Sequence, residues 1–326
     1  TIRLIKLFNY ATLIKFLDRR IMKYTEQQIR DIFSLNRLGI AGVDIAFAVN
    51  ASKSGVNEFL AKHREDKLKG PNIVFLDIET SAAKVYAFGR HKQFINQDAV
   101  IEEGGNILMA GVSSIKSSQV LLLSCTPNEA KSGEDFNVCQ VIRESLEDAD
   151  AIVAHNGKNF DIKMLENRFS FHGIRPLRKV PILDTLEMAK KAYRLPSNKL
   201  DSIAAYFDIG RKIDTGGIDL WVRVQSGDKK ALEEMQEYCK HDVELLKRVF
   251  LELRARGITA GFNAGLYYQD HNHRCKVCGS SATTFTGKIA TTPAGVYHET
   301  ECLECGAFSR TKDNILSKDK RSTLLS

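Results

Sequence analysis

The sequence has no run of about twenty apolar residues, the length a membrane-spanning helix needs, so no transmembrane segment is expected. Residues 1–23 have an apolar rhythm, but charged residues interrupt it, and a small-residue cleavage site is missing. We therefore expect no secretory signal there. Two interpretations of these residues stay open: a helix, or sequence that precedes a start at Met22. No internal repeat is present.

An even number of cysteines is also missing. Three of the seven cysteines, Cys125, Cys139 and Cys239, stand alone in the chain, and we expect them to be buried as small apolar side chains. The odd total and the missing secretory signal argue against a disulfide framework. They favour a protein that works in a reducing compartment inside the cell, such as the cytoplasm. The other four cysteines form two Cys-x-x-Cys pairs near the end of the sequence.

With 43% hydrophobic and 27% charged residues, the composition is typical of a globular chain. The net charge of +7 is uneven: residues 1–70 carry 13 Lys and Arg against 7 Asp and Glu, residues 71–267 carry 26 against 27, and residues 268–326 carry 8 against 6. Basic flanks around a nearly neutral centre suit a polyanion held at the edges and a cation bound in the core. Basic surfaces are also common in proteins that never bind nucleic acid.

Residues 24–66 are predicted to form three short helices separated by tight turns. Thr25 is the expected N-cap of the first helix and Ser52 that of the third. A helix, a turn and a capped helix resemble the helix-turn-helix unit that binds DNA. The residues that would contact DNA are Lys53, Ser54, Asn57 and Glu58, on the exposed side of the third helix. The alternative interpretation is a small helical packing module.

Residues 71–267 are predicted to form an α/β domain. Strands are expected over residues 73–76, 106–114, 119–124, 151–155 and 182–183. Helices are expected over residues 138–146, 162–171, 201–207 and 229–256. An antiparallel start followed by alternating helices and strands predicts a mixed five-stranded sheet with helices on its faces.

Acidic residues lie beside several of these apolar segments. Asp77 and Glu79 follow the first strand, and because side chains alternate along a strand, both should point to the same side of the sheet. Two adjacent carboxylates repel each other unless a proton or a cation lies between them, and Mg²⁺ or Mn²⁺ prefers such oxygen ligands. A solvated strand end is the alternative for this pair alone. Asp161 should begin a helix after a buried strand, and Tyr238 and Asp242 lie one turn apart on a helix.

Three segments, Phe-Leu-Asp-Ile-Glu-Thr at 75–80, His-Asn-Gly-Lys-Asn-Phe-Asp at 155–161 and Tyr-x-x-x-Asp at 238–242, resemble the three exonuclease motifs of the DEDD superfamily. The tyrosine is similar to the subtype found in family B polymerase proofreading domains and their stand-alone relatives, whereas the histidine subtype would have His where this chain has Glu237. Segments 183–186, 198–201 and 218–221, with Gly-Asp at 227–228, resemble the stand-alone enzymes. The resemblance covers residues 71–267.

This resemblance implies an RNase H-like fold and a 3′→5′ exonuclease that uses two Mg²⁺ or Mn²⁺ ions. Asp77, Glu79 and Asp242 would bind the ion that activates the attacking water. Asp77 would also contact the second ion, with Asp161 acting through water, and this ion would stabilise the leaving 3′ oxygen. Tyr238 would orient the water.

The terminal nucleotide would be held by Asn156, Phe160 and Thr80, although Phe160 could equally pack in the core. Asp184 is either a further carboxylate of the site or the N-cap of the helix that follows, and we favour the cap.

Residues 271–310 carry the two Cys-x-x-Cys-Gly knuckles and are predicted to form a zinc ribbon. The four ligands of one structural Zn²⁺ would be Cys275, Cys278, Cys302 and Cys305. Residues 283–297 should form a β-hairpin between the knuckles. A redox dithiol would call for a thioredoxin-like surround, which the sequence lacks. Residues 311–326 are polar and are expected to form a flexible tail.

The sequence thus predicts an exonuclease with a helix-turn-helix before it and a zinc ribbon after it. Nucleic acid is the expected partner, and DNA is favoured because the helix-turn-helix suggests duplex DNA nearby. The alternatives are an RNA exonuclease and a DNA-binding regulator with an inactive nuclease fold. A fragment of a polymerase is disfavoured, because no polymerase motif is present.

Overall fold

The computed structural model describes residues 23–89 and 94–323, so the expectations for residues 1–22 lie outside it. The chain divides into two compact units. The larger contains residues 68–270 and 276–279, and the smaller contains residues up to Lys67, residues 271–275 and those from Ser280 on. Within the described ranges, none of the helices combines the length and the apolar character needed to span a bilayer.

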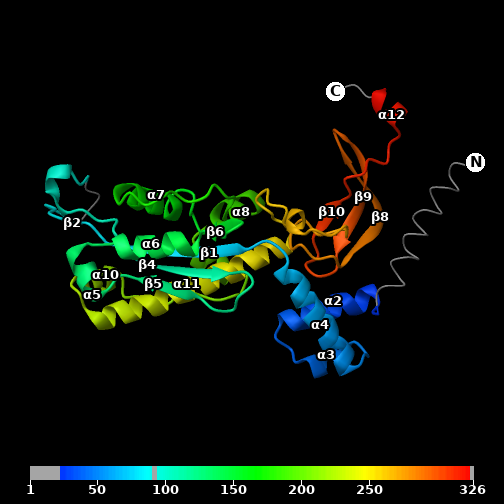
Figure 1. Cartoon of the computed structure of the whole chain (residues 1–326), viewed down its shortest axis with the longest axis horizontal. Coiled ribbons are helices and arrows are strands. Elements are labelled where there is room, and N and C mark those ends of the chain that lie inside the picture. Colours follow the sequence, from blue (N-terminus) through cyan, green and yellow to red (C-terminus); the bar gives the residue numbers. More distant parts are fainter. Residues whose placement is uncertain (1–22, 90–93, 324–326) are drawn as a thin grey trace, which may run out of the picture. The chain divides into compact units, whose positions relative to one another are not determined.

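A five-stranded sheet forms the centre of the larger unit (Figure 1). Its strands are β1 (Ile73–Thr80), β4 (Ile107–Ser114), β5 (Leu121–Ser124), β6 (Ala151–Ala154) and β7 (Ile182–Asp184). The order is β5-β4-β1-β6-β7, with β4 antiparallel to β1 and to β5, and β6 parallel to β1 and to β7. The predicted mixed five-stranded α/β sheet is therefore confirmed.

Helices cover both faces of this sheet. They are α5 (Pro127–Ser132), α6 (Phe136–Ser145), α7 (Asp161–Phe171), α8 (Thr185–Ala192), α9 (Leu200–Tyr206), α10 (Ile218–Gln225) and α11 (Lys229–Ala255), and a short 3-10 helix, η2 (Ala264–Tyr267), follows. In Figure 1, α6 and α7 lie on one side of the sheet and α11 runs along the other.

The alternation of side chains along β1 produces these two faces. Val74, Leu76 and Ile78 belong to the core that contains the buried residues of α6 and α7. Ile73 and Phe75 belong to the core that contains α8, α9 and the second half of α11. Asp77 and Glu79 have the same parity as Ile73 and Phe75, so they share one side of the sheet, as the strand periodicity predicted, and this side faces α11.

An extension of the chain between β1 and β4, which forms a separate two-stranded sheet, was not anticipated from the sequence. It consists of β2 (Lys84–Val85), a 3-10 turn η1 (Gln97–Ala99) and β3 (Val100–Glu102), which pairs with β2. Its base is fixed where the side-chain amide of Gln225 donates to the carbonyl of Ala82 and accepts from its N–H, at 3.0 and 2.9 Å. Strands of two and three residues are too short to produce a recognisable alternation.

The smaller unit contains helices from one end of the chain and strands from the other. The helices are α2 (Glu26–Arg37), α3 (Gly42–Ala48) and α4 (Lys53–Leu68). Thr25 caps α2 with a capping box, and the hydroxyl of Ser52 accepts from the N–H of Gly55 in the first turn of α4. The three predicted helices and their two caps are therefore present.

A three-stranded sheet completes the smaller unit. Its strands are β8 (Thr283–Thr292), β9 (Gly295–Cys302) and β10 (Phe308–Arg310), with β9 in the middle. The predicted hairpin is formed by β8 and β9, whose last and first residues, Thr292 and Gly295, pair around the turn. In the segment after β10, the N–H groups of Thr311 and Ile315 donate to β9 carbonyls, and a short helix α12 (Lys318–Ser322) follows.

Candidate active site and metal centres

Three carboxylates from two elements meet at the face of the sheet that α11 covers. Oxygen atoms of Asp77, Glu79 and Asp242 lie within 4.8 Å of one another. The close approach of α11 depends on Gly111, which pairs with Asp77 across the strands β1 and β4. A Cβ atom at Gly111 would lie 2.6 Å from a methyl carbon of Val243, the residue after Asp242. Only a glycine therefore allows the helix to bring Asp242 to β1.

Asp161, the fourth predicted acid, is the first residue of α7 and is 3% exposed. Its Oδ1 accepts a hydrogen bond of 3.2 Å from the N–H of Ile78, which lies between the two acids of β1. Asp161 is not one of the three acids whose oxygens lie within 4.8 Å, yet its charge still raises the pKa of Asp77. The structure thus places it beside the cluster, facing the same strand.

The loop before Asp161 is held by a buried carboxylate. Asp184 accepts hydrogen bonds from the N–H groups of Asn156 and Lys158, at 2.9 and 3.2 Å. It also accepts from the N–H of Leu186 and is thus the N-cap of α8, as favoured from the sequence. Asn156 has a φ of 65°, a left-handed conformation that asparagine tolerates better than most residues. Asp184 therefore fixes the turn that leads into Asp161.

Burial and mutual repulsion oppose ionisation of the cluster. Burial, followed by the charges of Asp161, Glu79 and Asp242, raises the pKa of Asp77 well above its usual value. Burial and the charge of Asp242 raise the pKa of Glu79 to about 8. Burial also raises the pKa of Asp161 to about 7. At neutral pH, a proton or a bound cation must offset the repulsion between these groups, as is typical of carboxylates that bind a divalent ion.

One atom of the cluster supports this interpretation independently. Asp242 is only 1% exposed, and its Oδ1 is buried without a hydrogen-bond partner among the described residues. A buried carboxylate oxygen without a partner is unfavourable unless something binds it. The residues present therefore fit a divalent cation held between β1 and α11.

A cation that the sequence analysis missed already contacts the cluster. The ammonium of Lys212 lies 2.5 Å from Oδ2 of Asp242 and 3.1 Å from the hydroxyl of Tyr238. Its backbone N–H donates to Asp201 at 2.8 Å, which fixes the loop that carries it. Although burial opposes its charge, Asp242 raises the pKa of Lys212, so the side chain is an ammonium. No sequence motif marks this lysine, because 30 residues of chain separate it from Asp242.

Tyr238 lies one turn before Asp242, as predicted, and its hydroxyl reaches the cluster through Lys212. Burial and the charge of Asp242 raise its pKa, so the phenol keeps its proton at neutral pH. Its ring also packs edge-on against the ring of Trp221, with centroids 6.1 Å apart.

The predicted nucleotide-binding residues surround this face. Thr80 ends β1, and Asn156 lies in the turn held by Asp184. The side chain of Phe160 is 41% exposed, so the alternative that it packs in the core is wrong. The aromatic ring is available for stacking next to Asp161.

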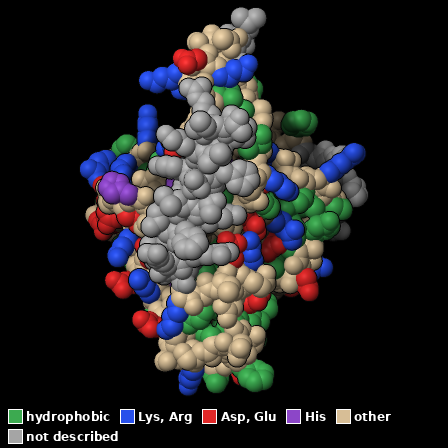
Figure 2. Space-filling view, turned by 90° about the vertical axis from the view of Figure 1, so that its right-hand side faces the viewer, with side chains coloured by type: hydrophobic (Ala, Val, Ile, Leu, Met, Phe, Trp, Pro, Cys, Tyr) green, Lys and Arg blue, Asp and Glu red, His purple; other side chains and the backbone are tan. Residues whose placement is uncertain are grey.

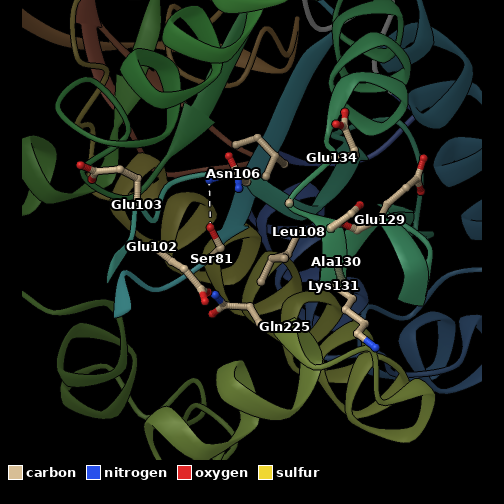
Figure 3. Close-up of a pocket in the computed structure, with 13 residues that line it drawn as sticks. Ser81, Glu102, Glu103, Asn106, Leu108, Glu129, Ala130, Lys131, Glu134 and Gln225 are labelled. Atoms are coloured by element: carbon tan, nitrogen blue, oxygen red, sulfur yellow. Dashed lines mark hydrogen bonds between the residues drawn. The ribbon is translucent and has the colours of Figure 1, made fainter. Parts of the chain in front are cut away.

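A separate hollow of about 270 Å³ lies at the base of the β2–β3 extension (Figure 3). Among the described residues that line it, one is a cation, Lys131, and four are glutamates; the glutamates are Glu102, Glu103, Glu129 and Glu134. None of the described residues that line it belongs to the carboxylate cluster. Its negative charge disfavours a phosphodiester chain, and we assign it no role in binding one.

A second candidate metal centre is formed by the four paired cysteines. The sulfur atoms of Cys275, Cys278, Cys302 and Cys305 all lie within 4.8 Å of one another. The sulfurs of Cys275 and Cys305 are 3.7 Å apart, close to the edge of about 3.8 Å of a tetrahedron with Zn–S bonds of about 2.3 Å. The cluster therefore fits one Zn²⁺ ion. The isolated cysteines are buried, as predicted; they are Cys125, Cys139 and Cys239.

The residues predicted to contact DNA lie in the first two turns of α4. Lys53, Ser54 and Asn57 are exposed, but the amide of Asn57 also lies against α3, where a Cβ atom at Gly42 would be 2.2 Å from its oxygen.

Residues 1–22, outside the described part, supply five of the thirteen basic residues of the first 70 and one of the seven acids. On the face shown in Figure 2, Lys and Arg side chains are dispersed among Asp and Glu side chains.

Residues 74–254 match the family model of the RNase H superfamily. The chain is 24% identical over 159 residues to the PolC-type DNA polymerase III of Ureaplasma parvum, a match that covers 45% of this chain and 10% of that protein. It is 28% identical over 200 residues to the corresponding protein of Mycoplasma pneumoniae, with 57% and 13% covered. The chain thus spans only about a tenth of the length of these relatives.

Among solved structures, a family B DNA polymerase from Pyrobaculum calidifontis is similar, with 12% identity and a TM-score of 0.41. This similarity covers 57% of this chain and 25% of the polymerase.

Proposed function

The chain belongs to the RNase H superfamily, and on this basis we propose that it is a two-metal-ion exonuclease that shortens nucleic acids from their 3′ ends. The observation that carries the proposal is the cluster of Asp77, Glu79 and Asp242, with oxygens within 4.8 Å of one another and Asp161 beside them. Carboxylates this close together are stabilised by divalent cations, and pairs of such cations catalyse phosphodiester cleavage in many nucleases.

The residues of the cluster would bind two ions, with different residues as the ligands of each. Asp77, Glu79 and Asp242 would hold one Mg²⁺ or Mn²⁺, and Asp77 with Asp161 would take part in holding another. Two such ions, when bound, supply an activated water and stabilise the charge on the leaving 3′ oxygen. The unpartnered Oδ1 of Asp242 and the raised pKa values of Asp77 and Glu79 support this division.

Neighbouring side chains would position the reactants. Tyr238 keeps its phenolic proton, so it can donate a hydrogen bond to the attacking water, and with this role the chain would belong to the tyrosine subtype of DEDD exonucleases. The exposed ring of Phe160 would stack on the terminal base, while Asn156 and Thr80 would hold the sugar and phosphate.

DNA is the proposed substrate, and the smaller unit is its proposed binding module. The relatives with matching segments are named as DNA polymerases. Three helices with Lys53, Ser54 and Asn57 exposed at the start of α4 are compatible with a helix-turn-helix, whose second helix enters the major groove by its first residues. The four cysteines would hold one structural Zn²⁺ in a zinc ribbon. RNA cleavage and an inactive nuclease fold that only binds DNA are the alternatives.

Digestion of end-labelled substrates tests the proposal. Single-stranded DNA, duplex DNA and RNA labelled at the 5′ end would be incubated with Mg²⁺, Mn²⁺ or EDTA. We expect a descending ladder on DNA with either metal and no products with EDTA. Asp77→Asn and Asp242→Asn should abolish the ladder, whereas Glu237→Gln, which removes an exposed carboxylate from the same helix α11, should not.

The outcomes separate the alternatives. Metal-dependent products from RNA alone would contradict the DNA assignment. Internal fragments without a ladder would contradict exonuclease action. A folded wild-type protein that binds DNA but yields no products with either metal would favour the inactive fold.

A further inference from the structure

The two ends of the chain share one hydrophobic core in the smaller unit. Leu303, which lies inside the second cysteine pair, is 3% exposed. It packs in the same buried cluster as the apolar residues of the three helices, among them Ile29, Ile32, Phe33 and Val56. More than 230 residues of sequence separate α4 from this leucine. The helices are thus completed by a residue that the cysteine knuckle presents.

Polar contacts join the same two parts, and they also come from residues next to the cysteines. Arg274, which precedes Cys275, donates to both carboxylate oxygens of Asp66 in α4, at 2.7 and 2.8 Å. Arg274 is almost fully buried, with 4% of its side chain exposed. Both knuckles therefore supply a contact: Arg274 beside the first and Leu303 within the second.

Glu304, the other residue inside the second pair, binds three side chains of the helices. Its carboxylate lies 3.1 Å from the ammonium of Lys67 and 3.3 Å from the ring of His63 in α4. Its carbonyl accepts from Arg37 at the end of α2 at 2.8 Å. Glu301, the residue before Cys302, pairs with Arg30 of α2. The second knuckle and the residue before it thus contact both α2 and α4.

These contacts lie next to the cysteines, so their positions depend on whether the two Cys-x-x-Cys pairs are folded. Binding of a metal by Cys-x-x-Cys pairs is coupled to their folding, since the sulfur atoms repel one another as thiolates and no large core surrounds them. Each docking residue of the ribbon is the immediate neighbour of a cysteine in the sequence; these residues are Arg274, Glu301, Leu303 and Glu304. The helices α2–α4 form a module of fewer than 50 residues, a size at which a core of its own is marginal.

We propose that the metal ion of the four-cysteine cluster controls the folding of the N-terminal helices, because it fixes the knuckle residues that complete their core. The ribbon docks on the C-terminal half of α4 and on α2, and leaves the first turns of α4, with Lys53 and Asn57, exposed. Loss of the metal therefore loosens the surface that α4 presents. This inference is independent of the nuclease proposal, since it involves none of the carboxylates of the candidate active site.

Hydrogen exchange in the full-length protein, followed by mass spectrometry, tests this control. Zinc would be removed with a zinc-selective chelator at constant Mg²⁺, and metal content would be measured by atomic absorption. We expect exchange in peptides of α2 and α4 to rise about tenfold or more when zinc is lost, and to return when zinc is added back. Peptides of β1 and α11 in the larger unit should not change.

Variants separate metal binding from docking. Cys302→Ser should lose zinc and show the same fast exchange in α2 and α4, whereas Cys125→Ser, the same change at an isolated buried cysteine, should leave these peptides unchanged. Leu303→Ala and Glu304→Gln should keep one zinc per chain and still speed exchange in the helices. Exchange in α2 and α4 that stays slow after zinc loss, or in zinc-bound Leu303→Ala, would overturn the proposal, as would a protein that binds no zinc.

Discussion

Raising the pH of the metal-free protein from about 5 to about 7 should destabilise the larger unit, and a divalent cation should reverse the loss. Burial, with the charges of neighbouring acids, raises the pKa of Glu79 from 4.5 to about 8 and that of Asp161 from 3.8 to about 7. In this range the unfolded chain has lost both protons and the folded chain keeps them. The stabilisation from these groups is complete below the unfolded pKa and disappears as the pH rises through the folded pKa.

The size of the effect follows from the number of protons. Each group that stays protonated only in the folded state reduces the free energy of unfolding by about 1.4 kcal/mol per pH unit. Glu79 and Asp161 together therefore contribute up to nearly 3 kcal/mol per unit between about pH 5 and about pH 7. Asp77, whose pKa burial also raises, adds up to one further increment of the same size. Over its full shift, Glu79 alone could account for about 5 kcal/mol. A bound cation replaces the protons, so this slope should be absent with saturating Mn²⁺.

Urea unfolding followed by tryptophan fluorescence measures this directly. The sequence has one tryptophan, Trp221, and its ring lies 6.1 Å from that of Tyr238, so its emission reports the unit that holds the cluster. Midpoints would be compared in EDTA and in Mn²⁺ at each pH, and the difference isolates the cluster from other titrating groups. Glu79→Gln should reduce the slope in EDTA by about a third, because it removes one of the three groups with raised pKa values; the others are Asp77 and Asp161. A stability in EDTA that is constant or rises with pH would refute this reasoning.

Three further predictions concern single side chains. Tyr238→Phe keeps the ring and removes the hydroxyl, so cleavage should slow by about 10²-fold in single-turnover assays, and a wild-type rate would reduce Tyr238 to a packing residue. Lys212→Met removes the ammonium that pairs with Asp242, so calorimetry should find Mn²⁺ bound about tenfold more tightly or better; weaker binding would contradict competition for that carboxylate. Lys53→Ala should flatten the dependence of log DNA affinity on log salt by about one unit, and an unchanged slope would make α4 a packing element.

The features predicted from the sequence are those set by local periodicity. The sheet follows from short apolar strands and the helices that alternate with them. The common face of Asp77 and Glu79 follows from the strand period, and that of Tyr238 and Asp242 follows from the helical turn. The caps at Thr25 and Ser52 follow from residue type and position, and all of these features are present in the structure.

The missed features depend on contacts between distant parts of the chain. Gly111 matters only because the register of β4 puts it opposite Asp77 and under Val243. Lys212 matters only because its loop returns to α11 at Asp242. The contact of Leu303 with the helical core joins the two ends of the sequence. No local pattern marks any of these residues, because their roles arise from tertiary packing.

The arrangement of the acids also bears on the alternative of an inactive fold. A buried cluster of carboxylates with raised pKa values lowers the stability of the metal-free protein at neutral pH. An amide at position 77 would relieve this repulsion, keep the shape of the side chain and leave the strand pairing with Gly111 unchanged. A fold used only as a scaffold would gain stability from that change and lose nothing. The acid is therefore best explained by what it binds, and Asp77→Asn should raise metal-free stability at about pH 7 while removing the response of that stability to Mn²⁺.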